Sequence, residues 1–380
     1  MSEMSYLEKL LDGVEVEWKT LGSIAELKRG TSITKKDVID GTIPVVAGGR
    51  TPAYYHNTSN RDGQTIVIAG SGAYAGFVSW WEEPIFVSDA FTVKPHNILL
   101  PRYCYHFLMN MQQQLHEFKS GGGVPHVYPR DVSPILIPIP CPDTPEKSLA
   151  IQSEIVRILD KFTALTAELT AELTAELNMR KKQYNYYRDQ LLSFKEGEVE
   201  WKTLGEVAVI GTGNHDTQDA IEHGKYIFYA RGREPLKLNV FDFDETAIIT
   251  AGDGAGVGKV FHYAKGKYAL HQRAYRIVPN AFMNPRFVYH YITAYFFTYI
   301  QKASVSSSVT SLRRPMFLKF PIPVPPSEEQ ARIVEILDKF DTLTNSITEG
   351  LPREIELRQK QYEYYRDLLF SFPKPETVSN

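Results

Sequence analysis

Apolar side chains recur at intervals of three and four over residues 148–194, a segment without proline or glycine. This spacing places them along one face of an amphipathic α-helix. The stripe comprises Ile151, Ile155, Ile158, Leu159, Phe162, Leu165, Leu169, Leu173 and Leu177. At 1.5 Å per residue, a helix of about 45 residues extends roughly 65–70 Å, which is longer than a small domain would bury.

A second helix is expected over about 328–372. It is interrupted near Pro352, because proline disfavours helical geometry at the residue before it. Ahead of each helix, an apolar strand-like run ends in a glycine turn, at Gly70 and at Gly252, and a proline-rich exit follows. The pattern therefore predicts an α/β module, a proline-rich hinge and a long helix, twice in succession.

Long stretches of the sequence also occur twice. Residues 16–22 return unchanged at 199–205, whereas residues 155–162 and 183–189 return with one substitution each at 333–340 and 361–367. By contrast, residues 25–135 and 206–318 share little beyond the strand-and-turn skeleton. A period of about 180 residues indicates a duplicated unit of module and helix and excludes a solenoid.

The N-terminal segment Tyr6–Leu11 resembles the end of the first helix at Tyr187–Leu192. The chain thus begins with the tail of a helix like the one with which it ends. We expect the two ends to lie close together, the molecule to have a pseudo-two-fold axis, and the long helices to pack as an antiparallel coiled coil between the modules. A generic dimerisation coiled coil is the alternative interpretation of the helices.

The tetrapeptide Thr-Ala-Glu-Leu occurs three times in tandem, over residues 166–177. Four helical residues add about 6 Å and a net turn of ~40°. One base pair of B-DNA rises ~3.4 Å and turns about 34–36°. Adding or removing one tetrapeptide would therefore re-phase two attached domains by about one or two base pairs. Replication slippage in a good helix-forming sequence is the alternative.

Composition limits the function classes. With 380 residues, 43 % hydrophobic and 23 % charged, the chain is typical of a globular protein of two or three domains. Two cysteines cannot build a disulfide framework or a cysteine-rich zinc site. The first 20 residues do not resemble a signal peptide, and no apolar run approaches the ~20 residues of a membrane span. We expect a cytoplasmic protein.

Charge is unevenly distributed along the chain. Residues 18–140 carry 11 Lys/Arg against 9 Asp/Glu, and residues 201–325 carry 15 against 9. The remainder carries 16 against 27, so the modules are basic and the helices are acidic. Basic modules suit phosphate binding, and acidic helices suit a protein partner.

Basic, aromatic and hydrogen-bonding side chains cluster in both modules. The candidate DNA contacts of the first module are Lys28, Arg29, Lys35, Lys36, Arg50, Ser71, Tyr74, His126, Tyr128 and Arg130. Those of the second are Arg231, Arg233, Lys259, His271, Gln272, Arg273, Arg276, Arg313 and Arg314. Arg and Gln can read guanine and adenine edges, whereas Lys and Arg also bind phosphates. For any one of these arginines, a solvated or structural role is the alternative.

Catalytic motifs are missing from the sequence. Residues 252–259 resemble a phosphate-binding loop, but Asp253 stands where a glycine is needed and Val260 where Ser or Thr is needed. A strand-ending turn is the better interpretation of this segment. The histidines lack metal-ligand spacing, and we find no catalytic, metal or dinucleotide-binding motif. The sequence therefore predicts a binding protein without catalytic or metal residues.

Taken together, the duplicated frame, the Thr-Ala-Glu-Leu tandem and the divergent modules resemble the specificity subunit (HsdS) of type I restriction-modification enzymes, in its type IC branch. The resemblance implies an α/β fold class with two globular target-recognition domains separated by two long conserved helices. The expected domains are a first recognition domain at 1–147, a central helix with the spacer repeats at 148–195, a second recognition domain at 196–326 and a C-terminal helix at 327–380.

The resemblance also implies what the subunit does and what it binds. Each recognition domain would read one half of a split, asymmetric double-stranded DNA sequence, and the number of tetrapeptides would set the spacer. The subunit would bind no cofactor. It would recruit two HsdM methyltransferase subunits, which use S-adenosylmethionine, and HsdR subunits, which use ATP and Mg²⁺.

We expect one set of residues to pack the helices and dock HsdM. This set comprises Leu159, Phe162, Leu169, Leu173, Leu177, Tyr184, Tyr187, Leu337, Phe340, Tyr362 and Tyr365. Two alternatives come from other classes. A self-contained restriction or methylating enzyme would need the missing motifs, and a coiled-coil scaffold without DNA binding would leave the basic modules unexplained.

Overall fold

The computed structural model describes residues 6–120, 123–195, 197–303, 311–346 and 348–374. The chain divides into two compact units. Unit 1 comprises residues 1–172 and 355–380, and unit 2 comprises residues 173–354. Each unit therefore holds one module together with part of both long helical segments. The domain boundaries expected from the sequence stay a prediction.

Unit 1 is built around an antiparallel four-stranded sheet in the order β2-β8-β5-β6. Its strands are β2 (Ala25–Arg29), β8 (Ala90–Pro95), β5 (Thr65–Ala69) and β6 (Val78–Trp81). Every residue of β5 is buried, as the uninterrupted apolar run predicts. A three-stranded sheet, β4-β3-β7, consists of β3 (Ile43–Val46), β4 (Tyr54–His56) and β7 (Phe86–Val87).

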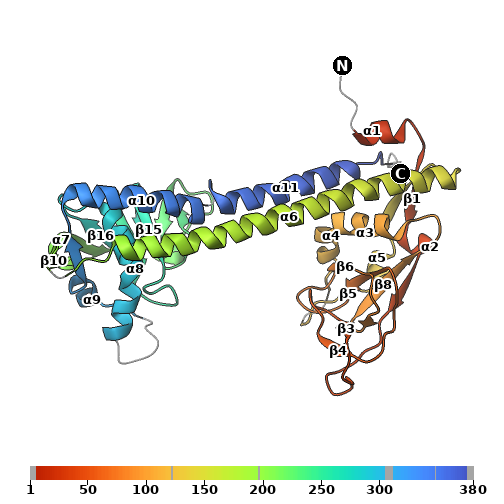
Figure 1. Cartoon of the computed structure of the whole chain (residues 1–380), viewed down its shortest axis with the longest axis horizontal. Coiled ribbons are helices and arrows are strands. Elements are labelled where there is room, and N and C mark those ends of the chain that lie inside the picture. Colours follow the sequence, from red (N-terminus) through yellow and green to blue (C-terminus); the bar gives the residue numbers. More distant parts are fainter. Residues whose placement is uncertain (1–5, 121–122, 196, 304–310, 347, 375–380) are drawn as a thin grey trace. The chain divides into compact units, whose positions relative to one another are not determined.

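The proline-rich exit of unit 1 pairs with the start of the module. Strand β1 (Val16–Thr20) lies antiparallel to β9 (Leu136–Pro140). The helices of the module are α1 (Tyr6–Leu11), α2 (Leu21–Ile24), α3 (Pro101–Asn110), α4 (Gln112–Glu117) and α5 (Pro129–Val132). Helix α3 packs against strands β5, β6 and β8, beside the long helix α6 (Pro145–Leu191) (Figure 1).

Unit 2 contains a six-stranded sheet in the order β11-β16-β14-β15-β12-β13. Its strands are β11 (Ala208–Thr212), β16 (Ala274–Pro279), β14 (Phe243–Ala251), β15 (Phe261–Leu270), β12 (Tyr226–Tyr229) and β13 (Leu236–Leu238). The first four repeat the order of the unit 1 sheet, so the module fold is duplicated although the module sequences differ. Strands β12 and β13 extend the sheet beyond this shared part.

The remaining elements of unit 2 also have counterparts in unit 1. Strand β10 (Glu200–Thr203) pairs antiparallel with β17 (Pro321–Val324), as β1 does with β9. The helices are α7 (Leu204–Val207), α8 (Pro285–Ala303), α9 (Arg314–Leu318) and α10 (Ser327–Asn345), with a 3-10 turn η1 (Thr217–Asp219). Helix α8 packs on α10, as α3 lies beside α6.

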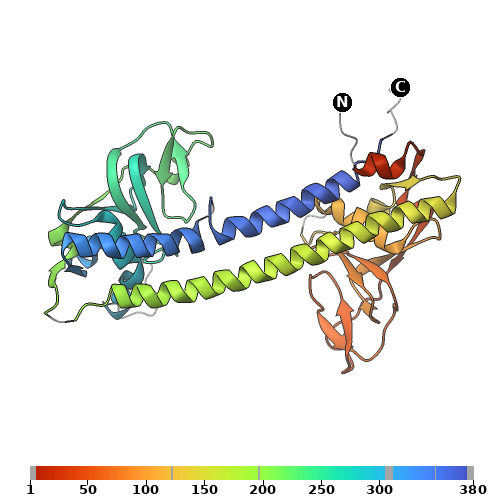
Figure 2. The ribbon, with the colours of Figure 1, turned by 45° about the horizontal axis from the view of Figure 1, so that its top comes forward.

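The first predicted helix is confirmed as the continuous 47-residue helix α6, whose residues are divided between the two units. The second predicted helix consists of α10 and α11 (Leu351–Leu369), separated by a break that the two blue helices show in Figure 2. Gly350 in this break has a φ of +86°, in the left-handed region that glycine adopts without a steric penalty. The interruption predicted from Pro352 is therefore confirmed.

In unit 1, helices α6 and α11 pack in opposite directions. The Phe162 and Tyr365 rings stack with centroids 5.2 Å apart, and Thr163 Oγ1 donates to the Tyr362 hydroxyl over 3.1 Å. Leu159 is buried at this contact layer. In unit 2, the ring of Tyr187 stacks on Phe340 at 5.5 Å.

Helix α1 and the end of α11 belong to one hydrophobic core in unit 1. Leu7 and Leu11 of α1 pack in the same buried cluster as Leu369 and Phe370. The Trp18 Nε1 group donates to the carbonyl of Pro373 over 2.8 Å. The prediction that the two ends of the chain lie close together is therefore confirmed for helix α1 and for the residues from Leu369 to Pro373. None of the helices in the described ranges combines the length and apolar character of a membrane span.

Candidate nucleic-acid interface

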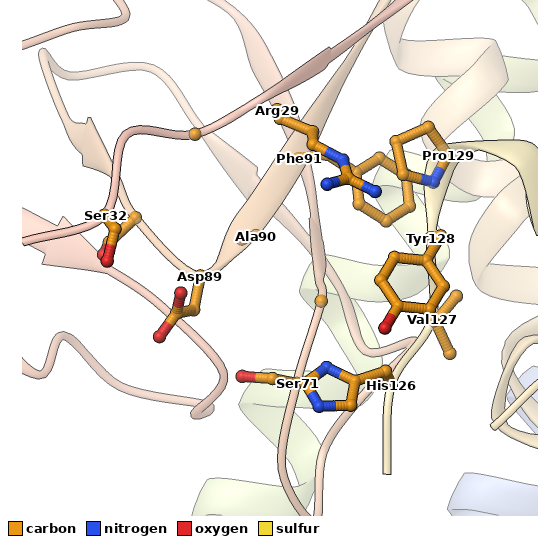
Figure 3. Close-up of a pocket in the computed structure, with 13 residues that line it drawn as sticks. Arg29, Ser32, Ser71, Asp89, Ala90, Phe91, His126, Val127, Tyr128 and Pro129 are labelled. Atoms are coloured by element: carbon orange, nitrogen blue, oxygen red, sulfur yellow. The ribbon is translucent and has the colours of Figure 1, made fainter. Parts of the chain in front are cut away.

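A notch opens in unit 1 where β2 ends, β8 begins and the chain turns after β5. Its volume is about 260 Å³, and it is bordered by the loop that precedes α5. Figure 3 shows Arg29, Tyr128 and His126 along one side, with Ser32 and Asp89 along the opposite side. We call this the unit 1 notch. It contains hydrogen-bond donors and acceptors, the groups with which a protein can contact base edges.

Aromatic stacking fixes the loop side of the unit 1 notch. The rings of His126 and Tyr128 are nearly parallel, with centroids 5.7 Å apart. The guanidinium groups of Arg29 and Arg130 lie over the Tyr128 ring at 5.3 and 4.8 Å. The loop is tied to the sheet by a β-bridge between Ser71 and His126. Five predicted contacts, Arg29, Ser71, His126, Tyr128 and Arg130, thus come together at one site.

The second notch lies at the same place in the unit 2 fold and has a volume of about 280 Å³. It is lined by Thr212, Gly252, Asp253, Gln272, Arg273, Tyr275, Ser311 and Leu312. We call this the unit 2 notch. Gln272 and Arg273 are exposed in the turn between β15 and β16. The Gln272 Nε2 group donates to Asp216 Oδ2 over 3.1 Å.

An aspartate at the unit 2 notch holds two of the predicted arginines. Arg231 Nη1 donates to Asp253 Oδ1 over 3.0 Å, and Arg273 Nη1 donates to Asp253 Oδ2 over 3.1 Å. Partial burial alone would raise the pKa of Asp253, but the two guanidinium groups outweigh it and the pKa is lowered. Asp253 is therefore a charged anchor that sets the direction of both side chains.

The turn at 252–259 follows β14 directly, so the prediction of a strand-ending turn is confirmed. Gly254 and Gly258 have φ values of +81° and +66°, which the chain needs in order to reverse direction there. Lys259 is exposed, and its ammonium lies 5.0 Å from the centre of the Phe297 ring.

Most of the other predicted contacts lie on the surface. In unit 1, Arg50 is exposed over the ring of Tyr74 at 4.9 Å. In unit 2, Arg313 and Arg314 are exposed at the start of α9. The remaining exposed positions are Lys28, Lys35, Lys36 and Arg233.

Two predicted contacts lie deeper in the module. His271 is only 1 % exposed, and its Nδ1 accepts from the Arg273 backbone N–H over 2.9 Å, which supports the β15–β16 turn. Arg276 is half-buried on β16, where it pairs with Glu245 at 2.7 Å and lies over the Phe243 ring at 4.3 Å. The contact of either residue with DNA stays a prediction.

The expected helix-interface residues are placed unequally. Leu337 is buried in the core of unit 2, and Phe340 contacts Tyr184 and Tyr187. Leu169, Leu173 and Leu177 are half-buried along α6. Tyr362 and Tyr365 are half-buried on α11. Their part in docking another subunit stays a prediction.

A His–Asp–Arg cluster that the sequence analysis missed joins the unit 1 module to its helix. The carboxylate of Asp160 on α6 lies 2.7 Å from His106 Nε2 and 2.9 Å from Arg102 Nε, both on α3. His106 is 1 % exposed, and burial lowers its pKa despite the nearby Asp160. An ionised carboxylate only accepts hydrogen bonds, so the ring proton faces Asp160.

The same cluster recurs in unit 2. Asp338 on α10 lies 2.7 Å from His290 Nε2 and 2.6 Å from Arg286 Nε, both on α8, and Arg286 also pairs with Asp341 at 2.7 Å. Burial alone would raise the pKa of Asp338, but the hydrogen bonds from His290 and Arg286 lower it. The sequence carried a signal for both clusters, since Pro-Arg-x-x-Tyr-His occurs at 101–106 and 285–290.

Asp89 and Asp253 were also missed at the notches. Each lies in a short turn without a motif of its own, so only the fold shows that it borders a candidate site. Within the described residues, no group of three or more His, Cys, Asp or Glu side chains could hold a metal ion.

The fold defines a class of protein: a chain in which one α/β module occurs twice, with a notch at the same place in each unit. The chain matches the family described as "Type I restriction modification DNA specificity domain" over residues 13–179 and again over 196–357. It belongs to this family. As a specificity subunit, it is the non-catalytic component of a restriction-modification system that recognises DNA sequence.

Curated relatives extend over the whole chain. The specificity subunit of the Escherichia coli type I restriction enzyme EcoR124I/EcoR124II is 43 % identical, with all of both chains covered. The specificity subunit of the Escherichia coli type I restriction enzyme EcoprrI is 37 % identical, covering 92 % of this chain and 93 % of the relative.

Two solved structures share the fold. The S subunit of the type I restriction-modification system of M. genitalium is 18 % identical, with a TM-score of 0.57, and covers 98 % of this chain and all of that one. A chain from a structure of the type I R-M system that addresses complex assembly and conformational transition is 16 % identical, with a TM-score of 0.59 and coverage of 93 % and 97 %.

Proposed function

We propose that each unit reads one half of a split, asymmetric DNA sequence. The observation that carries this proposal is that one module fold occurs twice and presents a notch at the same place, with different side chains around it. Two equivalent surfaces with different hydrogen-bonding groups suit two different half-sites. Exposed Lys28, Lys36 and Arg233 supply phosphate contacts that position each module without reading sequence.

The helices, in this proposal, set the distance between the half-sites. Helix α6 is continuous across all three Thr-Ala-Glu-Leu copies, so each copy contributes its full rise and rotation. A hinge or break within the repeats would decouple their number from the spacer. The break in the second helical segment lies elsewhere, between α10 and α11.

The helices would also dock two HsdM methyltransferase subunits. Tyr186 on α6 and Tyr364 on α11 occupy equivalent positions of the repeat and are 62 % and 63 % exposed. Exposed tyrosines at duplicated positions suit two copies of one partner, because aromatic anchors dominate many protein interfaces. HsdM would supply S-adenosylmethionine chemistry, and HsdR subunits would supply ATP- and Mg²⁺-dependent cleavage. The chain itself would bind no cofactor and act in the cytoplasm, where the DNA lies.

Single-molecule sequencing of adenine methylation tests the function in cells that carry this chain with its HsdM partner. We expect a split, asymmetric motif that disappears when the chain is deleted. Two identical half-sites would contradict the proposal that the units read different sequences. The absence of any chain-dependent motif, with HsdM expressed and active, would overturn the function itself.

A further inference from the structure

The two notches correspond to each other through their backbone hydrogen bonds. In unit 1 the Gly70 N–H donates to the Asp89 carbonyl over 2.9 Å, and in unit 2 the Gly252 N–H donates to the Arg273 carbonyl over 2.8 Å. Asp89 and Arg273 therefore occupy equivalent positions, immediately before β8 and β16, each of which is the second strand of its sheet. Nothing in the repeated sequence motifs reveals this correspondence.

The opposite side of each notch corresponds in the same way. A β-bridge joins Ser71 to His126 in unit 1, and another joins Asp253 to Ser311 in unit 2. Ser71 is thus the counterpart of Asp253. Both follow the glycine that ends the central buried strand, so the fold fixes their positions independently of their side chains.

The side-chain charge differs between the two units at both of these equivalent positions. At the first position unit 1 has an acidic side chain, Asp89, where unit 2 has a basic one, Arg273. At the second position unit 1 has neutral Ser71, where unit 2 has acidic Asp253. Two copies of a fold that bind different ligands are expected to keep the same backbone and to differ in the hydrogen-bonding side chains that it carries.

We propose that the notches contain the base-reading positions of the two half-sites: Asp89 accepts from the exocyclic amino group of cytosine or adenine, and Arg273 donates to guanine. This inference rests on the proposed function, since it assumes that each unit reads one half-site. An ionised carboxylate only accepts hydrogen bonds, which matches an amino group in the major groove. The guanidinium fork matches the O6 and N7 acceptors of guanine.

The contacts of Asp89 and Arg273 favour a role in binding bases over a structural role. Asp89 is exposed, and within the described part of the chain its carboxylate forms no ion pair or side-chain hydrogen bond. The Arg273 side chain is 63 % exposed although one of its nitrogens is held by Asp253. Asp253 therefore positions Arg273, and among the described residues no other side chain occupies the rest of its guanidinium group.

The test uses the chain together with its HsdM partner in cells, with genomic DNA as the probe. The variants are Asp89→Ala and Arg273→Ala. Glu83→Ala is the control for unit 1, because Glu83 is an exposed carboxylate of the same module outside the notch. Arg233→Ala is the control for unit 2, because we place this exposed arginine on phosphates.

We expect Asp89→Ala to make the methylation motif degenerate at one C or A of one half-site, and Arg273→Ala at one G of the other. Discrimination at that base should fall about 5- to 150-fold, which is about 1–3 kcal/mol. Glu83→Ala should leave the motif unchanged, and Arg233→Ala should lower methylation of all sites alike. If Asp89→Ala loses specificity for a C, Asp89 contacts the amino group of cytosine; if it loses specificity for an A, Asp89 contacts that of adenine.

Three results would overturn the inference while the function stands: an unchanged motif in both variants, uniform loss of methylation without degeneracy, or degeneracy at a base of the wrong chemistry. If the unmodified chain directs no motif at all, the proposed function fails before the notches are tested.

Discussion

At the residue scale, Asp253 determines where two arginines point. Replacing it by asparagine removes the negative charge that accepts from Arg231 and Arg273. We expect Asp253→Asn to relax recognition of the second half-site, because freed arginine side chains contact several bases almost equally well. Stability should change by about 1 kcal/mol or less, since Asp253 is only partly buried and both arginines remain in contact with solvent.

Motif sequencing and thermal unfolding of the purified complex measure these two effects separately. Asp244→Asn serves as the matched control, because Asp244 is an exposed aspartate of the same unit outside the notch. A large loss of stability in Asp253→Asn, with an unchanged motif, would show that the residue supports the fold instead of positioning Arg273.

The His–Asp–Arg clusters, in which only the histidines are buried, give a second prediction at this scale. In Asp338→Asn the carboxylate is replaced by an amide, which leaves buried His290 and half-buried Arg286 with weakened partners. We expect the unit to lose about 1–3 kcal/mol, the usual cost of disrupting hydrogen bonds to a charged group. Hydrogen exchange should increase in α8, which this cluster joins to α10.

Asp160→Asn provides the reciprocal experiment. It should increase exchange in α3 of unit 1 and leave α8 unchanged, whereas Asp338→Asn should do the opposite. Asp143→Asn, at an exposed position before α6, should change neither. Equal effects of one variant on both helices would contradict the view that each cluster anchors only its own module.

At the scale of elements, the length of α6 gives a third prediction. Deleting residues 170–173 removes one Thr-Ala-Glu-Leu copy and keeps the helix continuous. The deletion removes about 6 Å and a net ~40°, so we expect the unspecified spacer to shorten by about one or two base pairs with both half-sites unchanged.

Methylation sequencing checks this deletion against Ala171→Ser, which alters an exposed residue of the same repeat and keeps the number of residues. The control should keep the original spacer. An unchanged spacer in the deletion variant would support replication slippage as the origin of the tandem and would contradict its action as a ruler.

The helices could be predicted from the sequence, whereas the sheet order could not. The period of three and four predicted α6 to within three residues at each end, and Pro352 predicted the break between α10 and α11. Sheet order could not be predicted, because β5 and β8 are neighbours only through long-range pairing. For the same reason the sequence identified Arg273 as a candidate but missed Asp253, which reaches it from a turn 20 residues away.

At the scale of the whole molecule, the duplication means that a residue can be substituted in one repeat while its equivalent in the other repeat is kept. The repeat aligns Tyr186 on α6 with Tyr364 on α11, and both are strongly exposed. If each anchors one HsdM subunit, Tyr186→Ala and Tyr364→Ala should each remove one of the two, and the double variant should remove both.

Native mass spectrometry of the complex counts the methyltransferase subunits directly. Loss of a tyrosine anchor weakens an interface by about 2 kcal/mol or more, roughly 30-fold in Kd, so the single variants should retain one tightly bound HsdM at concentrations where the unmodified chain binds two. Tyr55→Ala changes a tyrosine of 55 % exposure on β4, away from the long helices, and should keep both subunits. Two bound subunits in the double variant would place HsdM elsewhere on the chain. Loss of both in either single variant would mean that the sites assemble cooperatively, so that one duplicated surface alone cannot hold a methyltransferase.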